Sequence, residues 1–343
     1  MTAARVLRGA IIGYGHVAAE GHAPVWADRK GATIVAAVDA SPDRRERFRR
    51  AHPGGRAHAA VETLLAEETL DFVDVCTPPS SHAAVVMAAL GAGLHVLCEK
   101  PLTTSVADAL AIADAAGRNG RVVHAVHNWL AAALCRQVSA LVDAGRVGTV
   151  RRVTWRTLRT KPSVAVGDNS EVNWRLDPAI AGGGILLDHG WHAAYCVARW
   201  AGSPLRRLSA RLESRRFLDL AVEDTATVDL DFGEASGQIF LTWAAEERAN
   251  TVSVEGDRGR IEIVGDEVVL HGPGGGERWS CPPALSEGSH HPDWFAAVAD
   301  DFIAAARGEA ASNLEEAVLC ARVMDAAKAS SAAGGAWTAL DGD

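Results

Sequence analysis

VLRGAIIGYGHVA, residues 6–18, joins an apolar run to a glycine-rich turn. The run Val6–Ile12 predicts a strand, and the spacing of apolar residues predicts a helix over Val17–Asp28. Between them, Gly13, Gly15 and Ala18 fit the pattern G-x-G-x-x-A. In that pattern the first glycine allows a tight turn, the second lets the backbone approach a pyrophosphate, and the small third residue permits close helix–strand packing. The stretch therefore predicts a dinucleotide-binding turn.

The next strand supports this prediction. Thr33–Asp39 is a β-branched run that ends in an acid 21 positions after Ala18, where this fold places a carboxylate against the ribose 2′-hydroxyl. An ordinary surface aspartate is the alternative. Asp39 would repel a 2′-phosphate, so we expect NAD as the cofactor. Arg44 and Arg45 lie just beyond and could offset that repulsion, which keeps NADP open.

Strand and helix patterns go on alternating as far as residue 129. Helices are predicted at Val61–Glu68, His82–Ala92 and Ser105–Arg118, and strands at Asp71–Thr77, His95–Lys100 and Val122–Trp129. Such alternation with short connections is typical of an α/β fold with a doubly wound parallel sheet. We therefore expect residues 1–129 to form a Rossmann dinucleotide-binding domain.

The pattern changes over residues 130–343. After a helix at Leu134–Ala144, strands follow one another with few helices between them: Val150–Leu158, Leu205–Ser214, Thr225–Phe232, Gly237–Trp243, Thr251–Glu255, Ile261–Val264 and Val268–His271. One helix, Gly182–Trp200, lies between the first two strands, and Gly274–Gly276 is expected to be a loop. Helices at Trp294–Ala306 and Leu314–Ser330 end the chain. This order predicts an α+β domain with an open, mostly antiparallel sheet.

Composition excludes several classes of protein. The 343 residues carry 34 basic and 43 acidic side chains, a formal net charge of −9, which argues against nonspecific nucleic-acid binding. The six cysteines form no Cys-x-x-Cys pair, and His290-His291 lacks a third spaced ligand, so we expect no disulfide and no metal site. No apolar run reaches the ~18 residues of a membrane span, and the N-terminus lacks a signal-peptide pattern. We expect a soluble, cytoplasmic protein.

Glu99-Lys100-Pro101 stands at the carboxyl end of a predicted strand, where open α/β sheets bind ligands. There Lys100 could donate a hydrogen bond to a substrate oxygen and stabilise developing charge. The alternative is a lysine that extends to solvent and pairs with Glu99.

GGGILLDHGWH, residues 182–192, holds a second candidate site. Asp188 and His192 are four residues apart and share one face of the predicted helix, where a carboxylate would favour the protonated imidazole. A solvated polar pair is the alternative. The polar segment 161–178 before the helix is typical of a lid over a site, and within it Trp174 and Arg175 are candidate substrate contacts. By contrast, we expect Arg156, Arg159 and Lys161 to lie on a solvated strand face.

Together these motifs resemble the Gfo/Idh/MocA family, which includes glucose–fructose oxidoreductase and the inositol dehydrogenases. The resemblance runs through the glycine turn, Thr77-Pro78-Pro79-Ser80-Ser81-His82, Glu99-Lys100-Pro101, Gly183-Gly184 and the Asp188-x-x-x-His192 helix. It implies hydride exchange between NAD(P) and a hydroxyl or keto carbon of a sugar, cyclitol or related polyol. It also implies a homodimer or homotetramer that uses the outer face of the open sheet.

The same resemblance implies roles for single residues. His192 would accept the proton in oxidation, Lys100 would hold the reacting oxygen, and Asp188 would orient His192 or contact another hydroxyl. The positions implied for the cofactor, beyond the glycines and Asp39, are His16, Val17, Thr77, Pro78, Pro79, His82, Glu99, Lys100 and Asn128. Leu130–Ala133 departs from the family, because many relatives place an arginine and a proline there.

Two other functions stay open at this point. Some relatives are glycoside hydrolases that use NAD transiently, and others are non-catalytic sensors of sugars or dinucleotides. Neither the particular substrate nor the direction of the reaction follows from the sequence.

Overall fold

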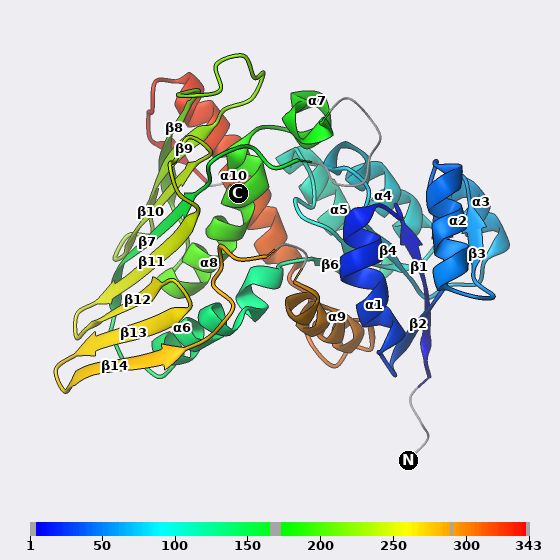
Figure 1. The fold of residues 1–343 in the computed structure, drawn as a ribbon, viewed down its shortest axis with the longest axis horizontal. Helices are drawn as coiled ribbons and strands as arrows, with labels where there is room; N and C mark the ends of the chain where they lie inside the picture. Colours follow the sequence, from blue (N-terminus) through cyan, green and yellow to red (C-terminus); the bar gives the residue numbers. More distant parts are fainter. Residues whose placement is uncertain (1–4, 165–172, 289–290, 341–343) are drawn as a thin grey trace. The chain divides into compact units, whose positions relative to one another are not determined.

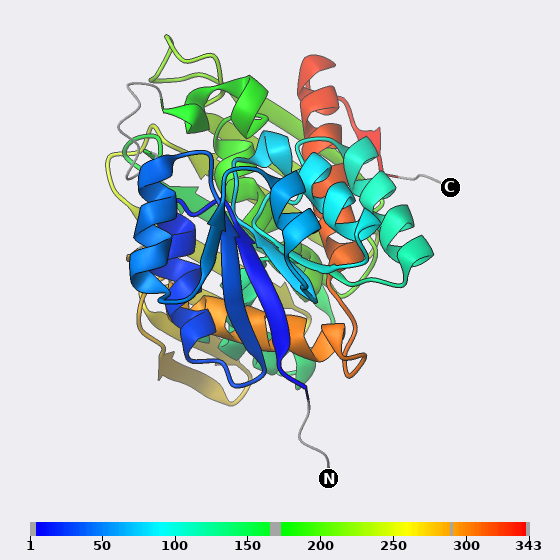
Figure 2. The same ribbon diagram turned by 90° about the vertical axis from the view of Figure 1, so that its right-hand side faces the viewer.

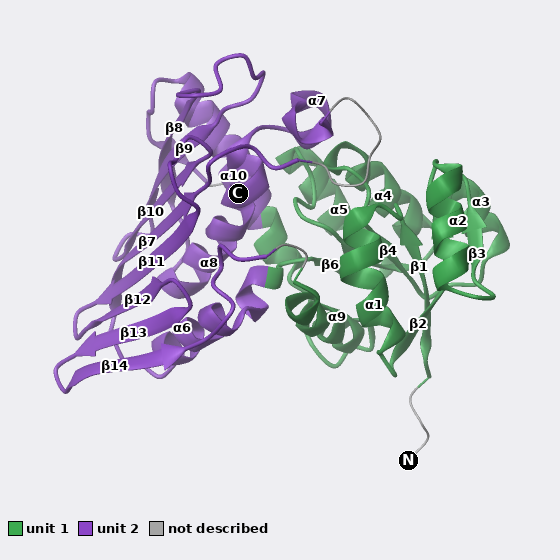
Figure 3. Cartoon of the chain, viewed as in Figure 1, with its two compact units in different colours: residues 1–128, 165–171, 289–318 green, residues 129–164, 172–288, 319–343 purple. Residues whose placement is uncertain are grey.

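The computed structural model describes residues 5–164, 173–288 and 291–340, which group into two compact units (Figure 3). Unit 1 contains the chain up to Asn128 together with residues 289–318. Unit 2 contains most of the remainder, from Trp129 to Gly288 and from Leu319 onward. The boundary between the two units falls inside helix α10 (Leu314–Ala332).

The sheet of unit 1 has the strand order β3-β2-β1-β4-β5-β6, and its described neighbours all run parallel (Figures 1 and 2). Its strands are β1 (Leu7–Ile12), β2 (Ala32–Val38), β3 (Arg56–His58), β4 (Phe72–Val75), β5 (His95–Cys98) and β6 (Val123–Ala125). The chain leaves β1 toward β2 on one side and returns to β4 on the other. The space beside the carboxyl end of β1 is thus the topological switch point, where such sheets bind ligands. The predicted doubly wound fold is confirmed.

Helices pack along this sheet. They are the π-helical turn η1 (Val17–His22), α1 (Ala23–Ala27), α2 (Pro42–Ala51), α3 (Val61–Glu67), the 3₁₀ turn η2 (Pro79–Ser81), α4 (His82–Gly91), α5 (Val106–Asn119) and α9 (Pro292–Ala306). The core joins Trp26 and Phe72 to Phe295 and Phe302 of α9, all buried. Helix α9 therefore completes the core of unit 1, although it lies far along the chain.

Two elements of unit 1 were not predicted. Helix α2 is dominated by charged residues, so it offers little apolar periodicity, and β3 has three residues. Three predicted strands are too long: β4 ends at Val75, β5 at Cys98 and β6 at Ala125. After β6, Asn128–Ala131 forms the 3₁₀ turn η3. These differences leave the order of the major elements unchanged.

The sheet of unit 2 has the order β14-β13-β12-β11-β7-β10-β9-β8-β15. Its strands are β7 (Val150–Leu158), β8 (Arg207–Glu213), β9 (Thr225–Asp231), β10 (Ser236–Thr242), β11 (Ala249–Gly256), β12 (Arg260–Val264), β13 (Glu267–Gly272), β14 (Gly275–Ser280) and β15 (Thr338–Ala339). Strands β7 and β10 pair in parallel and the other described neighbours are antiparallel, as expected of a mostly antiparallel sheet. The expected Gly274–Gly276 loop is wrong in part, since Gly275 and Gly276 begin β14 and pair with β13.

The other helical elements of unit 2 are α6 (Ala133–Asp143), the 3₁₀ turn η4 (Trp174–Leu176), α7 (Pro178–Ala181), the π-helical turn η5 (Leu186–Gly190) and α8 (Trp191–Ala201). Helix α8 packs on β7 and β10, and α6 packs on α8. The predicted helix Gly182–Trp200 starts too early, because Gly182 adopts φ 82° and ends α7. Among the described residues, no helix has the length and apolar character needed to cross a bilayer.

Candidate active site

The glycine turn after β1 packs against the end of β4. A Cβ atom on Gly13, whose φ is 89°, would come within 2.9 Å of the backbone of Cys76 and Thr77, so this position requires glycine. Gly15 differs: among the described residues, its Cβ would meet only Arg44, at 3.8 Å. Packing within the protein therefore does not demand glycine at position 15. The buried Ala18 packs into the core as expected.

Asp39 lies just after β2 and holds the turn in place. Its Oδ2 accepts a hydrogen bond from the Tyr14 backbone N–H at 2.9 Å, and its Oδ1 accepts one from Ser41 N–H at 2.8 Å. The Arg44 guanidinium lies 3.6 Å from the same carboxylate. An arginine thus stands next to both the acid and Gly15, and it reduces the negative charge at the position expected for the ribose.

Three more segments reach the same carboxyl edge of the sheet, one after each of β4, β5 and β6. After β4 come Thr77, Pro78 and Pro79, and the buried His82 follows with its ring nitrogens 2.7 Å from Thr77 O and 2.8 Å from Pro101 O. Burial lowers the pKa of His82, against the effect of these carbonyls, and the ring joins two loops. These contacts give His82 a role in the protein's own loop packing.

Glu99 and Lys100 follow β5. Glu99 Oε2 accepts the Lys100 backbone N–H at 2.9 Å, and Oε1 lies 3.1 Å from Nε2 of the buried His22. After β6, Asn128 is half-buried, and no hydrogen-bond partner of its buried Oδ1 is found among the residues that the structure describes. An unsatisfied acceptor at this edge fits a bound ligand that carries an amide or hydroxyl donor.

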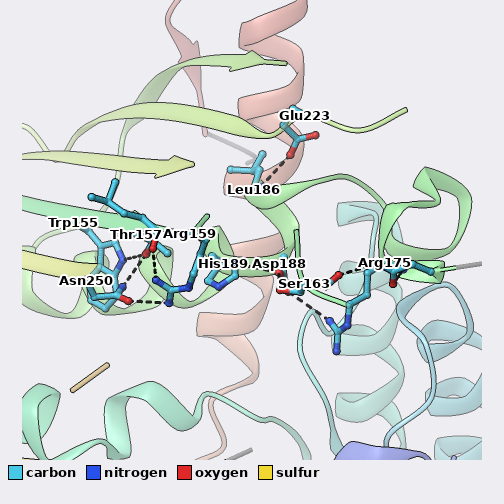
Figure 4. A network of polar contacts seen from close by, with 12 residues as sticks. Trp155, Thr157, Arg159, Ser163, Arg175, Leu186, Asp188, His189, Glu223 and Asn250 are labelled. Carbon is cyan, nitrogen blue, oxygen red and sulfur yellow. Dashed lines mark hydrogen bonds and ion pairs between the residues drawn. The ribbon is translucent and has the colours of Figure 1, made fainter. Parts of the chain in front are cut away.

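In unit 2, glycines stand at the start of the segment that carries the second candidate site. A Cβ on Gly184 would lie 2.0 Å from the Glu223 carbonyl oxygen, so the backbone of the segment before β9 crosses directly over this residue. The Glu223 carboxylate accepts hydrogen bonds from Gly184 N–H at 2.9 Å and Leu186 N–H at 3.0 Å. Glu223 thus holds the first amides of the helical segment that carries Asp188 and His192 (Figure 4).

Asp188 is a centre of polar contacts in this unit. Ser163 Oγ donates to its Oδ2 at 2.7 Å, and Arg175 Nη1 lies 3.5 Å from its Oδ1 (Figure 4). The neighbouring His189 Nδ1 is 3.1 Å from Oδ2. The side chain keeps 15% of its surface exposed. The carboxylate thereby connects the segments on either side of residues 165–172 to the helix.

His192 is held from another direction. Its ring is 5% exposed and stacks on Trp129, with centroids 4.5 Å apart. Nδ1 lies 2.8 Å from the hydroxyl of the buried Tyr195, whose oxygen also accepts the Trp129 backbone N–H at 3.1 Å. Tyr195 therefore occupies Nδ1 of the ring.

Trp174 and Arg175 form the short turn η4, and the guanidinium stacks on the indole at 4.6 Å. Only the ends of the expected 161–178 lid belong to the described residues; 165–172 lie outside them. The expectation of a solvated face is wrong for Arg159, which is 3% exposed. Its guanidinium donates to two backbone carbonyls and to Asn250, and burial lowers its pKa to about 10.

Sequence reasoning missed several residues that shape these sites: His22, Asp74, Ser163, Tyr195 and Glu223. Tyr195 had a weak signal, since it lies three positions after His192 on the same helical face. Glu223 had none, because its partner amides are almost 40 positions away in the chain. Long-range contacts of this kind leave no periodic trace in a sequence.

Comparison with known families agrees with the geometry. The family model described as "Oxidoreductase family, NAD-binding Rossmann fold" matches residues 7–127, and the GFO/IDH/MocA C-terminal domain matches residues 135–262. The two models belong to one family, occur in its order and together cover well over half of the chain. The chain therefore belongs to the Gfo/Idh/MocA family of oxidoreductases, and its N-terminal part is that family's NAD-binding Rossmann fold.

The sequence identity to individual relatives such as the following is low. The chain is 29% identical over 273 residues to D-apiose dehydrogenase of Paraburkholderia graminis, which covers 77% of this chain and 69% of that protein. It is 25% identical over 237 residues to the uncharacterized oxidoreductase YfiI of Bacillus subtilis, 66% of this chain but only 57% of YfiI. Among solved structures, an oxidoreductase from Agrobacterium radiobacter in complex with NAD+, L-tartaric acid and magnesium matches with a TM-score of 0.84. That match has 22% identity over 98% of this chain and 99% of the other, and such a likeness supports the fold alone.

Proposed function

We propose that this protein is an NAD-dependent oxidoreductase that acts on a hydroxyl or keto carbon of a sugar, cyclitol or related polyol. Residues 1–129 would bind the dinucleotide, and residues 130–343 would bind the substrate and form the contacts of a homodimer or homotetramer. The single observation that carries the proposal is the glycine turn, in a chain of this family: Gly13 is packed against Thr77, while a Cβ on Gly15 would meet only Arg44 among the described residues, at 3.8 Å.

Residues at the carboxyl edge of the unit 1 sheet would each bind a different part of the cofactor. The turn at Gly13, Gly15, His16, Val17 and Ala18 would hold the diphosphate, because backbone N–H groups at a helix start favour anions. Asp39 would face the adenosine ribose. Thr77, Pro78, Pro79, His82, Glu99 and Asn128 would line the part that receives the nicotinamide. When bound, the nicotinamide supplies the hydride acceptor or donor.

Two side chains would carry the chemistry at the substrate oxygen. In oxidation, His192 accepts the hydroxyl proton at Nε2, since Tyr195 holds Nδ1. The Lys100 ammonium donates a hydrogen bond to the same oxygen and stabilises the negative charge that develops there. Asp188 would accept hydrogen bonds from other hydroxyls of the substrate, with Trp174 and Arg175 nearby. In reduction the same groups act in reverse.

The direct test measures NADH formation with a panel of sugars, cyclitols and other polyols, and NADH consumption with keto-sugars. We expect Lys100→Met and His192→Ala each to lower kcat at least about 100-fold while the Kd of NAD stays within about threefold. The controls are Lys30→Met and His271→Ala, exposed residues that lose the same groups. Wild-type rates in both test variants would remove these residues from the mechanism.

Product analysis on the same samples separates the rival functions. Glycosidic cleavage without net NADH would replace this proposal by a hydrolase that uses NAD transiently. Binding of NAD without turnover of any substrate would favour a sensor.

Cofactor preference depends on Asp39 and Arg44. We propose NAD over NADP, because Asp39 would repel a 2′-phosphate, and Arg44 weakens that preference by its ion pair with the acid. Comparing kcat/KM for both cofactors tests this, and a clear NADP preference would overturn it. We also propose that the protein works in the cytoplasm as a homo-oligomer, which light scattering of the purified chain would test.

A further inference from the structure

A buried polar cluster lies beneath the Glu99–Lys100 turn of unit 1. It contains His22, Asp74, Cys76 and Glu99, from η1, β4 and the ends of β4 and β5. His22 and Asp74 are 2% and 0% exposed. His22 Nδ1 lies 2.9 Å from Asp74 Oδ2, and its Nε2 lies 3.1 Å from Glu99 Oε1. One imidazole therefore connects two carboxylates that belong to neighbouring strands.

The geometry requires a charged ring. A neutral imidazole has one N–H donor, so one of its two carboxylate contacts would then bring an unprotonated nitrogen against a negative oxygen. With both nitrogens protonated, both contacts are hydrogen bonds. Burial is the largest single effect and opposes this charge, but Asp74 and Cys76 together outweigh it and hold the pKa of His22 well above its usual range. The ring also stacks on Phe295 at 3.6 Å, and an aromatic face stabilises a cation.

The same cluster has the composition of a metal site, since ligand atoms of His22, Asp74 and Cys76 all lie within 4.8 Å of one another. Metal binding would need the Cys76 thiolate, and burial raises the pKa of this thiol to about 12. Asp74 is already satisfied in another way, because Trp26 Nε1 donates to its Oδ2 at 2.7 Å. The hydrogen-bonded imidazolium accounts for these contacts without an ion.

Stability alone does not explain why charges are buried here. The desolvation of a buried ion pair roughly cancels its attraction, and apolar replacements are often equally stable. What the cluster does provide is position. Glu99 is held at Oε1 by His22, and its Oε2 accepts the backbone N–H of Lys100 at 2.9 Å. The chain of contacts runs from Trp26 through Asp74, His22 and Glu99 to the backbone that carries the Lys100 ammonium.

We infer that His22 is a positioning residue for Lys100: as an imidazolium between Asp74 and Glu99, it fixes the turn from which Lys100 reaches the substrate oxygen. The inference rests on the proposed function in so far as Lys100 acts on substrate. Its structural half, the charged bridge that holds the Glu99–Lys100 turn, can be tested without any substrate.

Two substitutions distinguish the contact of His22 with Glu99 from its contact with Asp74. The amide nitrogen of glutamine reaches about as far as imidazole Nε2, so His22→Gln keeps a donor to Glu99. The amide nitrogen of asparagine reaches about as far as Nδ1, so His22→Asn keeps the Asp74 contact and loses the one to Glu99. His124→Asn is the matched control, because His124 is buried in the same sheet outside the cluster.

Hydrogen exchange at the Lys100 amide tests the structural half. We expect exchange of a peptide covering residues 95–104 to become faster in His22→Asn and to stay near wild type in His22→Gln and in the control. ¹⁵N NMR of the histidine rings should show a doubly protonated ring at pH 7 that disappears in His22→Gln. A neutral ring at position 22 would overturn the inference, as would a stoichiometric metal that is lost in His22→Gln.

Turnover tests whether His22 positions Lys100 for action on the substrate, using the polyol with the highest rate in the panel described above. We expect kcat to fall about 10- to 100-fold in His22→Asn, with rescue to within about threefold of wild type in His22→Gln and an unchanged Kd of NAD. Equal losses in both variants, or a change in NAD binding alone, would overturn the positioning role. If Lys100→Met keeps wild-type turnover, the proposed function fails instead, whereas the exchange and NMR results still decide the bridge.

Discussion

The most consequential single contact in unit 2 is the one between Tyr195 and His192. A neutral imidazole can serve as a base at only one nitrogen, and the partner of the other nitrogen selects the tautomer. Tyr195 is itself fixed by the Trp129 backbone N–H. The hydroxyl oxygen accepts from Trp129 N, and its contact with His192 Nδ1 selects the tautomer. Nε2 is the base in the form whose Nδ1–H donates to Tyr195.

We therefore predict that Tyr195→Phe lowers kcat about tenfold or more, because the buried Nδ1 loses its partner and the ring its preferred tautomer. NAD affinity should not change, since Tyr195 belongs to unit 2 and the glycine turn to unit 1. Steady-state kinetics with fluorescence titration of NADH would check this. A rise in KM with unchanged kcat would show that the hydroxyl serves substrate binding and leaves the base unaffected.

Single residues also show the limits of sequence reasoning. The sequence predicted that Asp188 and His192 share a helical face, yet a π-helical turn precedes α8, and Asp188 contacts residues 163, 175 and 189. Helical spacing gives the chance of contact but not the partner. The partner depends on which other segments the fold brings close, and those segments lie up to 25 residues away.

Among the elements, the start of the helical segment that leads into α8 is held by a close backbone approach. Three contacts tie it to the segment before β9: the Glu223 carboxylate holds two amides, and Ile185 N–H donates to the Glu223 carbonyl at 3.2 Å. Gly184 is essential to this arrangement because no Cβ fits beneath that carbonyl. Nothing in the local sequence indicates that the Glu223 backbone is the segment that approaches Gly184.

We expect Gly184→Ala to destabilise the protein by several kcal/mol, on the order of ~3, because either the Glu223 backbone or the helix must shift. Gly117→Ala is the matched control: in α5, a Cβ at Gly117 meets nothing within 4 Å, and the change should stabilise by about 0.5–1 kcal/mol. Urea unfolding monitored by tryptophan fluorescence measures both. Equal midpoints for the two variants would contradict the close approach.

For the whole molecule, the important result is that unit 1 is completed by helix α9. Phe302 is fully buried and contacts Trp26 and Phe72, with ring centroids 6.4 and 5.3 Å apart. The core of the dinucleotide-binding unit thus depends on residues almost 300 positions from its first strand. Alternation of strands and helices gave no sign of this, because α9 has the ordinary pattern of a C-terminal amphipathic helix.

Phe302→Ala should therefore cost about 3–5 kcal/mol, the usual loss for a buried phenylalanine. We predict in addition that the loss appears in the NAD-binding unit, so that the midpoint rises less on addition of NAD than in the wild type at equal concentration. The exposed neighbour Asp301→Ala should change stability by less than about 0.5 kcal/mol. Calorimetry with and without NAD provides the measurement. An unaffected midpoint in Phe302→Ala would contradict the assignment of α9 to this core.

The pH dependence of stability follows from the His22 cluster. Burial opposes charge on His22, but Asp74 raises its pKa in the folded chain, so its contribution is complete below pH 6.5 and is lost as the pH rises through the folded value. Burial likewise opposes ionisation of Glu99, but His22 lowers its pKa. Its contribution is present above pH 4.5 and is lost as the pH falls through the folded value.

Both contributions are therefore complete between pH 4.5 and 6.5. We predict that the difference in free energy of unfolding between wild type and His22→Gln is largest in this window and declines on its alkaline side. Urea titrations at a series of pH values would measure it. A difference that grows with rising pH would mean that the ring folds in its neutral form.

The sequence by itself determined the order of most strands and helices, the doubly wound class of unit 1, the glycine turn with its terminal acid, and the family. These features follow from local periodicity and from spacings of a few residues, which short-range sterics and hydrogen bonding enforce. The tertiary structure alone decided that His22 bridges Asp74 and Glu99, that Glu223 holds the entrance to α8, and that α9 closes the core of unit 1. Those contacts depend on how distant segments pack, because buried polar groups take whichever partners the fold places within hydrogen-bond distance.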